Sequence, residues 1–256
     1  MPLISIEQVS HLYVGTGGTP SWALRDVSLG LERGRFTCLV GPSGCGKTTL
    51  LQLIAGFLKP TAGNVQLDGK PITGPGPDRS VVFQEYALFA WFTVRQNVEF
   101  GLRVAGMKAA ERRKRSDDLL AMVGMSHAAE RYPHELSGGM RQRVAVARAL
   151  ATHPQVVLMD EPFAAVDALT RATLQEELLR LSQQLGLSIV FITHNVDEAV
   201  FLADDVVVMS AHPGTIQEIM TIDMPHPRDR GSAEFAKWYA RINAALHRDP
   251  KQKQAA

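Results

Sequence analysis

A glycine-rich segment at residues 41–49 carries the clearest chemical signal in the chain. Its residues are Gly41, Pro42, Ser43, Gly44, Cys45, Gly46, Lys47, Thr48 and Thr49, which contain the pattern G-x-x-x-x-G-K-[ST]. Glycines allow the backbone to wrap tightly, so that successive N–H groups face the oxygens of one phosphate. Lys47 would reach the β- and γ-phosphates, and the hydroxyl of Thr48 would ligate Mg²⁺. The pattern therefore predicts a site for ATP with Mg²⁺.

The neighbouring residues supply the context that such a site needs. Residues 36–40 form a nearly continuous apolar run, typical of a strand buried on both faces, and residues 50–57 continue as a helix. A helix that begins near Gly46 would add the positive end of its dipole to the phosphate site. The plainer alternative is a glycine-rich turn before an ordinary helix. Within the loop, we interpret Cys45 as a small filler residue rather than a redox group.

Two adjacent acids end a second apolar run. The four residues 156–159 are all apolar, and Asp160 and Glu161 follow them directly. A carboxylate at the carboxyl end of a parallel strand can hold Mg²⁺ directly or through water. Glu161 can orient or deprotonate an attacking water molecule. Taken alone, the pair is a weak signal, because buried strands often end with a charged residue at the surface. After a phosphate-binding loop, the pair predicts a hydrolytic site.

The elements that must position these groups alternate between strands and helices. Strands are expected at Leu3–Val14, Ala23–Leu31, Phe36–Val40, Ser80–Phe83, Gln155–Met159 and Ser188–Ile192, with a hairpin arm over Val65–Lys70. Helical periodicity dominates from about Phe92 to Leu150, which indicates an inserted helical lobe. The pattern predicts an α/β fold with a parallel sheet and crossover helices. Residues 231–256 are expected to form a surface helix with a polar tail.

Composition narrows the class of protein. The chain has 256 residues, of which 45% are hydrophobic, and this length suits one large domain or one domain with an inserted lobe. The net charge of +1 lacks the basic excess of nucleic-acid binders, so no nucleic acid is expected as a partner. The basic run at residues 112–115 is interpreted as a solvated helix face.

Cysteine use and hydropathy indicate the compartment. The two cysteines, Cys38 and Cys45, lie close together in the sequence, which disfavours a disulfide framework and indicates a reducing environment. No apolar run approaches the roughly 18 residues that a membrane-spanning helix needs, and the N-terminus lacks the regions of a signal peptide. We therefore expect a cytosolic protein, and any role at a membrane would have to come through a partner.

The segment at residues 136–143 points to one family. Its sequence, Leu-Ser-Gly-Gly-Met-Arg-Gln-Arg, resembles the signature motif of the ABC ATPases, and it stands before the acidic pair. The resemblance covers Leu3 to about Ser210. It implies a P-loop NTPase core with a parallel sheet, an N-terminal antiparallel β subdomain and an inserted α-helical subdomain at about 92–150, together forming an ABC ATPase domain over residues 1–230.

Other positions match the family's motifs in order. The resemblance implies that Tyr13 stacks on adenine and that Gln84, the Q-loop residue, contacts the metal and the catalytic centre. It assigns Asp167 to the D-loop and makes His194 the switch histidine that contacts the γ-phosphate. Each position has a plainer interpretation, as a strand aromatic, a loop residue or a structural histidine.

The chain also departs from the family's pattern. Ala164 and Val166 alter the D-loop, and Asn195 replaces the common Asp after the switch histidine. None of these changes removes a catalytic group, so they put the rate in doubt rather than the activity.

The signature segment implies that the protein works as a pair. A serine hydroxyl and glycine amides at a helix N-terminus form a second anion site. In the family's head-to-tail homodimer, Ser137, Gly138 and Gly139 of one copy close over the nucleotide held by Lys47 of the other. Hydrolysis removes the γ-phosphate contact and weakens the interface.

Softer signals resemble the nitrate/sulfonate/taurine importer branch. They lie at residues 89–91, 132–135, 140 and 225–230. This branch implies integral membrane permease subunits, a periplasmic or extracellular solute-binding protein, and a peripheral location on the cytoplasmic face of the inner membrane. In the family a short permease helix enters a groove beside the Q-loop, for which Tyr86, Leu88, Phe89 and Trp91 are candidate lining residues.

Two other functions remain open from the sequence. A soluble ABC-type ATPase in DNA repair or chromosome organisation usually contains coiled coil or large added domains, and neither is visible here. A non-enzymatic nucleotide sensor would be expected to lack the lysine or the base, yet Lys47 and Glu161 are both present.

Overall fold

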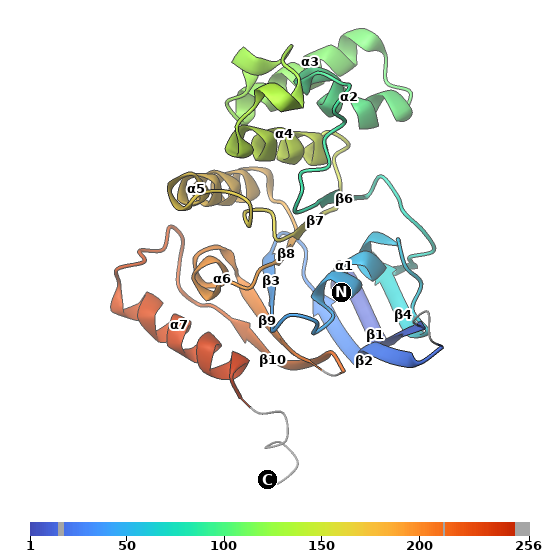
Figure 1. The fold of residues 1–256 in the computed structure, drawn as a ribbon, viewed down its shortest axis with the longest axis vertical. Helices are drawn as coiled ribbons and strands as arrows, with labels where there is room; N and C mark the ends of the chain where they lie inside the picture. Colours follow the sequence, from blue (N-terminus) through green and yellow to red (C-terminus); the bar gives the residue numbers. More distant parts are fainter. Residues whose placement is uncertain (15–17, 212, 249–256) are drawn as a thin grey trace. The chain divides into compact units, whose positions relative to one another are not determined.

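A computed structural model describes residues 1–14, 18–211 and 213–248 of the chain (Figure 1). It divides into two compact units. Unit 1 combines Met1–Pro75 with Gly186–Ala256, and unit 2 is Gly76–Leu185. Along the described ranges, no helix joins the length and the apolar character that crossing a bilayer requires.

An antiparallel sheet forms the first part of unit 1. Its strands are β1 (Ile4–Val14), β2 (Pro20–Leu31), β4 (Ala62–Leu67) and β5 (Lys70–Pro71), in the order β2-β1-β4-β5. Asp68 and Gly69 join β4 to β5 with φ angles of 51° and 72°. A two-residue turn with positive φ at both positions matches the twist of a hairpin, as the Asp-Gly pair predicts.

The phosphate-loop strand is central to the second part of unit 1. The strand β3 (Phe36–Val40) is fully buried and pairs in parallel with both β8 (Ile189–Ile192) and β9 (Asp205–Ser210). The strand β10 (Thr215–Thr221) pairs with β9 in antiparallel fashion. The helices of this unit are α1 (Lys47–Ala55), α6 (Val196–Leu202) and α7 (Ala233–Leu246). The sequence patterns gave no prediction for the residues of β9 and β10, and residues 249–256 of the expected polar tail lie outside the described residues.

Unit 2 joins a parallel strand pair to four helices. The strands β6 (Arg79–Val82) and β7 (Val156–Asp160) are parallel neighbours. The helices are α2 (Val94–Val104), α3 (Ala109–Met122), α4 (Gly138–Leu150) and α5 (Ala168–Leu185), with short 3-10 turns at Ser126–Ala128 and Pro133–Glu135. The expected helical region thus contains three separate α-helices.

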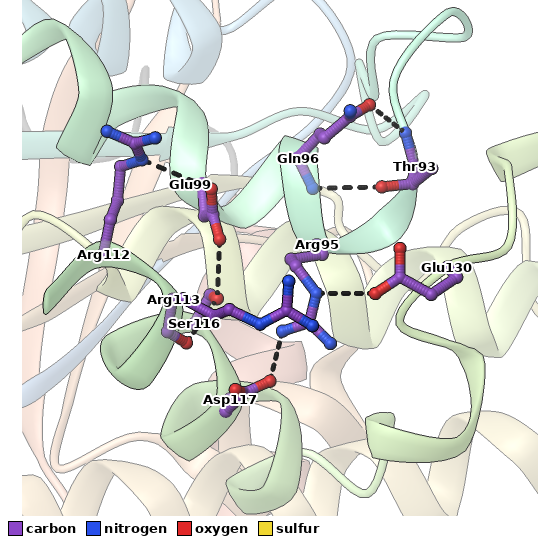
Figure 2. A network of polar contacts seen from close by, with 9 residues as sticks. All are labelled: Thr93, Arg95, Gln96, Glu99, Arg112, Arg113, Ser116, Asp117 and Glu130. Carbon is purple, nitrogen blue, oxygen red and sulfur yellow. Dashed lines mark hydrogen bonds and ion pairs between the residues drawn. The ribbon is translucent and has the colours of Figure 1, made fainter. Parts of the chain in front are cut away.

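Ion pairs connect α2 to α3 and to the segment that follows α3 (Figure 2). Arg95 on α2 pairs with Asp117 on α3 and with Glu130. One turn along α2, Glu99 accepts from Arg112 at 3.3 Å. Arg112 is therefore engaged with α2. The prediction of a solvated face over residues 112–115 was wrong at this position, because α3 turns Arg112 toward an acid that the sequence places thirteen residues earlier.

Candidate active site

The phosphate loop keeps its shape through glycines at crowded positions. Gly46, the residue before α1, has a φ of 88°, and a Cβ there would lie 2.8 Å from the Ala23 carbonyl oxygen. A Cβ at Gly41 would lie 2.7 Å from the Met209 carbonyl oxygen. Because other side chains would collide with backbone at both places, the chain can pass from β3 into α1 by this route only with glycine.

Lys47 lies over the loop that precedes it. Its side chain is buried, and Nζ donates to the carbonyl oxygens of Gly41 at 2.8 Å and Pro42 at 3.0 Å. Nζ also lies 3.6 Å from Sγ of the buried Cys45. Burial raises the pKa of Cys45, although Lys47 opposes this effect. A thiol with a raised pKa is a poor nucleophile, which supports the interpretation of Cys45 as a filler.

Tyr13 lies beside the start of α1. Its hydroxyl oxygen is 3.4 Å from the hydroxyl oxygen of Thr49. His11 meets its ring edge-on, with centroids 4.8 Å apart, and the tyrosine remains 43% exposed. Unit 1 therefore brings an accessible aromatic ring to the helix that carries the phosphate loop.

His194 follows β8 at the same sheet edge as the phosphate loop. Leu39 on β3 is the register partner of Ile192 on β8, so Gly41 and His194 each lie two residues beyond a paired position. The backbone N–H of Thr193 also donates to the Leu39 carbonyl oxygen at 3.3 Å. The parallel pairing thus places the histidine and the loop at neighbouring strand ends, with His194 exposed.

The residues around His194 are fixed by a helix cap. The Asn195 side chain accepts from the Asp197 N–H at 2.9 Å at the start of α6. The Thr193 hydroxyl accepts from the Asn195 N–H at 3.0 Å and donates to the buried Glu198 carboxylate at 2.5 Å. Asn and Asp cap helices about equally well, so Asn195 keeps the structural task of the Asp that the family pattern has there.

Unit 2 holds Gln84, Asp160 and Glu161 at one strand edge. Val82 on β6 is the register partner of Met159 on β7, so Gln84 and Glu161 each lie two residues beyond paired positions. Both acids are half-buried. Glu161 has a φ of 46°, which is uncommon for a residue other than glycine and is typical of strained functional positions.

Asp167 begins α5. Its carboxylate accepts from the Thr170 N–H at 3.0 Å, and its carbonyl accepts from the Arg171 N–H at 2.8 Å. The hydrogen bonds from Thr170 lower the pKa of this exposed carboxyl group. Of the two departures before it, Ala164 is exposed and Val166 is buried, and the Val166 carbonyl accepts from the Arg171 side chain at 2.9 Å. The aspartate of this loop is therefore positioned by a helix cap.

Ser137, Gly138 and Gly139 form the start of α4, here called the signature turn. The Ser137 hydroxyl accepts from the Met140 N–H at 3.3 Å, and Ser137 is exposed. A Cβ at Gly139 would lie 2.6 Å from the Thr170 methyl carbon, so the turn packs closely against α5. The first N–H groups of a helix have no intrahelical acceptor, which makes such a turn an anion site.

Comparison with known proteins decides the family. Residues 24–164 match the ABC transporter family model. The chain belongs to the ABC transporter family as an ATP-binding subunit with ATPase activity. It is 48% identical to a nitrate import ATP-binding protein of Synechocystis, over 95% of this chain and 94% of that protein. It is also 49% identical to an uncharacterised ABC transporter ATP-binding protein of Methanocaldococcus jannaschii, over 93% of this chain and 89% of that one.

Solved structures agree on the fold. A bacterial ABC transporter cassette solved as a dimer is 31% identical, with a TM-score of 0.77, and the match covers 87% of this chain and all of that chain. A cassette of Clostridium perfringens that is part of a transporter complex is 29% identical, with a TM-score of 0.78, over 96% and 98% of the two chains. The predicted ABC ATPase fold is confirmed.

Two side chains that no motif marks, the buried Asn97 and the half-buried Arg148, hold the ABC ATPase's Q-loop segment (residues 84–93). The Asn97 side chain accepts from the Phe89 N–H and donates to the carbonyl oxygens of Phe89, Phe92 and Thr93, at 2.9 to 3.2 Å. Arg148 on α4 donates to the carbonyl oxygen at position 87 at 2.7 Å, and burial lowers its pKa. The signal available in the sequence was a polar residue among apolar ones within the expected helical region, at Asn97 and at Arg148.

The candidate groove residues differ in exposure. Trp91 is 70% exposed, and its ring lies 5.6 Å from that of the half-buried Phe89. Leu88 is half-buried. Tyr86 is buried, so the prediction that it lines an accessible groove was wrong. A left-handed backbone at this residue turns its side chain inward.

Proposed function

We propose that the chain is the ATPase subunit of an importer for a small anionic solute and that it works as a homodimer around two ATP molecules. Relatives of similar sequence are a nitrate import ATP-binding protein and, at 46% identity over 89% of this chain, a bicarbonate transport ATP-binding protein of Synechococcus elongatus. Their names, which give nitrate and bicarbonate, support a small anion as the solute, and the resemblance to the importer branch adds a sulfonate or taurine to the candidates. In this assignment residues 1–230 form the ATPase domain, about 92–150 form its inserted helical subdomain, and 231–256 are a C-terminal extension.

Different side chains would bind the phosphates, the base and the metal ion of ATP. Lys47 and the loop N–H groups bind the phosphates, and Tyr13 stacks on the base. The hydroxyl of Thr48, the carboxylate of Asp160 and the amide oxygen of Gln84 are the oxygen donors that Mg²⁺ prefers. When bound, the metal would neutralise charge on the phosphate oxygens.

Hydrolysis then depends on a base and on closure from a second copy. Glu161 accepts a proton from the attacking water, and His194 contacts the γ-phosphate. Ser137 and Gly139 of the partner close over that phosphate, with Asp167 near the shared interface. The exposed Ser137 at a helix N-terminus supports this role, because its hydroxyl is accessible to a second copy.

A permease would dock beside the Q-loop. The exposed Trp91 ring beside Phe89 offers an apolar surface for a short helix from a membrane subunit. In this proposal the protein works at the cytoplasmic face of the inner membrane, and a periplasmic or extracellular binding protein selects the solute. A soluble ATPase that is not coupled to transport would need no such surface.

The observation that carries the proposal is Glu161, which follows Asp160 in a strained conformation at the carboxyl edge of β7. Glu161→Gln should retain ATP binding, form an ATP-dependent dimer and lose at least about 100-fold in phosphate release. Cells that depend on this variant should lose uptake of the imported anion, measured with labelled nitrate, taurine, an alkylsulfonate and bicarbonate.

A matched control is Glu176→Gln, which changes an exposed glutamate on α5 and should leave phosphate release and uptake unaltered. Near-normal phosphate release by Glu161→Gln would refute the base assignment. Uptake of all four anions that is unchanged by Glu161→Gln would refute the importer assignment while leaving the ATPase assignment intact.

A further inference from the structure

Tyr86 combines two features that disfavour folding, two residues after Gln84. Its φ is 61°, in the left-handed region that bulky residues rarely occupy. Its side chain is only 8% exposed, and within the described part of the chain its hydroxyl has no hydrogen-bond partner. A buried hydroxyl without a partner carries a desolvation cost. Such costs persist at positions that serve function, so Tyr86 calls for a functional explanation.

Three residues of helix α4 lie close to this tyrosine. A Cβ on Gly138, in the signature turn, would lie 3.3 Å from the Tyr86 hydroxyl oxygen. The Arg141 guanidinium lies 5.7 Å from the centroid of the tyrosine ring. Further along α4, Arg148 donates to the carbonyl oxygens of Tyr86 at 3.0 Å and Ala87 at 2.7 Å. The unpartnered hydroxyl therefore faces the first turn of α4, while its own backbone is held by the same helix.

We infer that Tyr86 is a positioning residue for the signature turn. When that turn closes on a nucleotide, the Tyr86 hydroxyl oxygen accepts a hydrogen bond from the Gly138 N–H. This inference rests on the proposed homodimer around ATP. Because the Gly138 N–H is then occupied, the Ser137 hydroxyl and the Gly139 N–H are left to face the γ-phosphate of the partner's nucleotide.

The same contact would connect two motifs within unit 2. Tyr86 belongs to the Q-loop segment and its hydroxyl faces Gly138 of the signature turn, so a displacement of Gln84 would be passed on to that turn. The orientation of Ser137 would then depend on the conformation of the Q-loop, through a chain of two contacts. The coupling would run from Gln84 to Ser137 through packing of Tyr86 and one hydrogen bond to Gly138.

Tyr86→Phe separates this role from simple core filling. If the tyrosine only fills space, removal of an unpartnered hydroxyl leaves dimerisation unchanged and stabilises the fold or has no effect on it. If the hydroxyl pairs with Gly138 in the closed dimer, the same substitution weakens dimerisation without weakening the free chain. A weaker dimer together with a free chain that is no less stable is a combination that a merely structural role cannot produce.

The experiment compares Glu161→Gln with Glu161→Gln/Tyr86→Phe as full-length chains. Analytical ultracentrifugation across an ATP series gives the dimer dissociation constant, which should rise about fivefold in the double variant. Thermal unfolding without nucleotide should show an equal or higher midpoint, and binding of a fluorescent ATP analogue to the monomer should be unaltered. The matched control is Tyr239→Phe, which removes a hydroxyl from the exposed Tyr239 on α7 and should change nothing.

Two results would overturn the inference. One is dimerisation of the double variant at the same ATP concentration as Glu161→Gln alone. The other is a lower unfolding midpoint for the double variant, which would show that the hydroxyl already has a partner in the free chain. If Glu161→Gln itself forms no dimer with ATP, the homodimer proposal is wrong and this inference is refuted with it.

Discussion

At the scale of single residues, three helix caps position groups of the candidate site. Ser137 caps α4, Asp167 caps α5 and Asn195 caps α6. Each cap fixes the backbone beside a group that is expected to contact nucleotide, because the capping side chain and the first helical N–H groups constrain one another. In this chain the loops that carry function are therefore shaped by helix starts, and substitution of a cap should affect both stability and rate.

Asn195 allows a clean test of this idea. Asn195→Asp should leave the free energy of unfolding nearly unchanged, because aspartate caps as well and adds a favourable charge at the helix N-terminus. Asn195→Ala should lower the free energy of unfolding by about 1 kcal/mol and should slow ATP hydrolysis, because His194 loses its fixed neighbour. Urea unfolding and a phosphate-release assay measure both effects. Equal behaviour of the two variants would show that the cap does not matter.

At the scale of elements, the Q-loop segment is held by side chains from α2 and α4. The segment has little regular structure, yet Asn97 makes four hydrogen bonds to its backbone while fully buried. Arg148 binds it from the other helix. A loop with buried backbone groups needs such partners, since unsatisfied buried groups are costly. The helices thus determine where Gln84 can lie.

Asn97→Leu should therefore be strongly destabilising. The leucine fills a similar volume but leaves the backbone groups of Phe89, Phe92 and Thr93 without these partners, so the free energy of unfolding should fall by about 3 kcal/mol. Gln183→Leu, at an exposed position on α5, is the matched control and should have little effect. Chemical denaturation measures both. A loss no larger than that of the control would mean that the segment does not depend on Asn97.

The sequence predicted the elements whose signal is local. Continuous apolar runs identified β3, β7 and β8, and the Asp-Gly pair identified the hairpin turn. The strand β9 has a comparable apolar run at Val206–Val208, for which no strand was predicted. The strand β10 mixes polar and apolar residues, and its strand state depends on pairing with β9, which no local pattern reveals.

The parts of the site that the sequence could not reveal depend on tertiary packing. Short sequence patterns predicted Lys47, Ser137 and Glu161 as site residues, because each pattern has a chemical reason. Asn97 carries no motif, and its role follows from a buried position that depends on how α2 meets the Q-loop segment. The burial of Tyr86 depends in the same way on a left-handed backbone conformation.

At the scale of the whole molecule, the nucleotide motifs are distributed over both compact units. Tyr13, Lys47 and His194 belong to unit 1, whereas Gln84 and Glu161 belong to unit 2 together with the signature turn. In the proposed homodimer the signature turn comes from the other copy, and a symmetric pair of this kind contains two equivalent composite sites.

Mixing two inactive variants tests whether the signature turn acts in the partner. Lys47→Ala removes the phosphate-binding lysine, and Ser137→Arg blocks the signature turn, so each variant alone should show little hydrolysis. In a mixed dimer, one site combines the intact Lys47 of one chain with the intact Ser137 of the other. An equal mixture should therefore regain activity, with about a quarter of all sites intact if chains pair at random. If the turn served its own chain's nucleotide, every site would carry a defect and the mixture would stay inactive.

Phosphate release measured across mixing ratios should pass through a maximum near equal amounts, whereas a straight line between the two inactive end points would contradict the shared site.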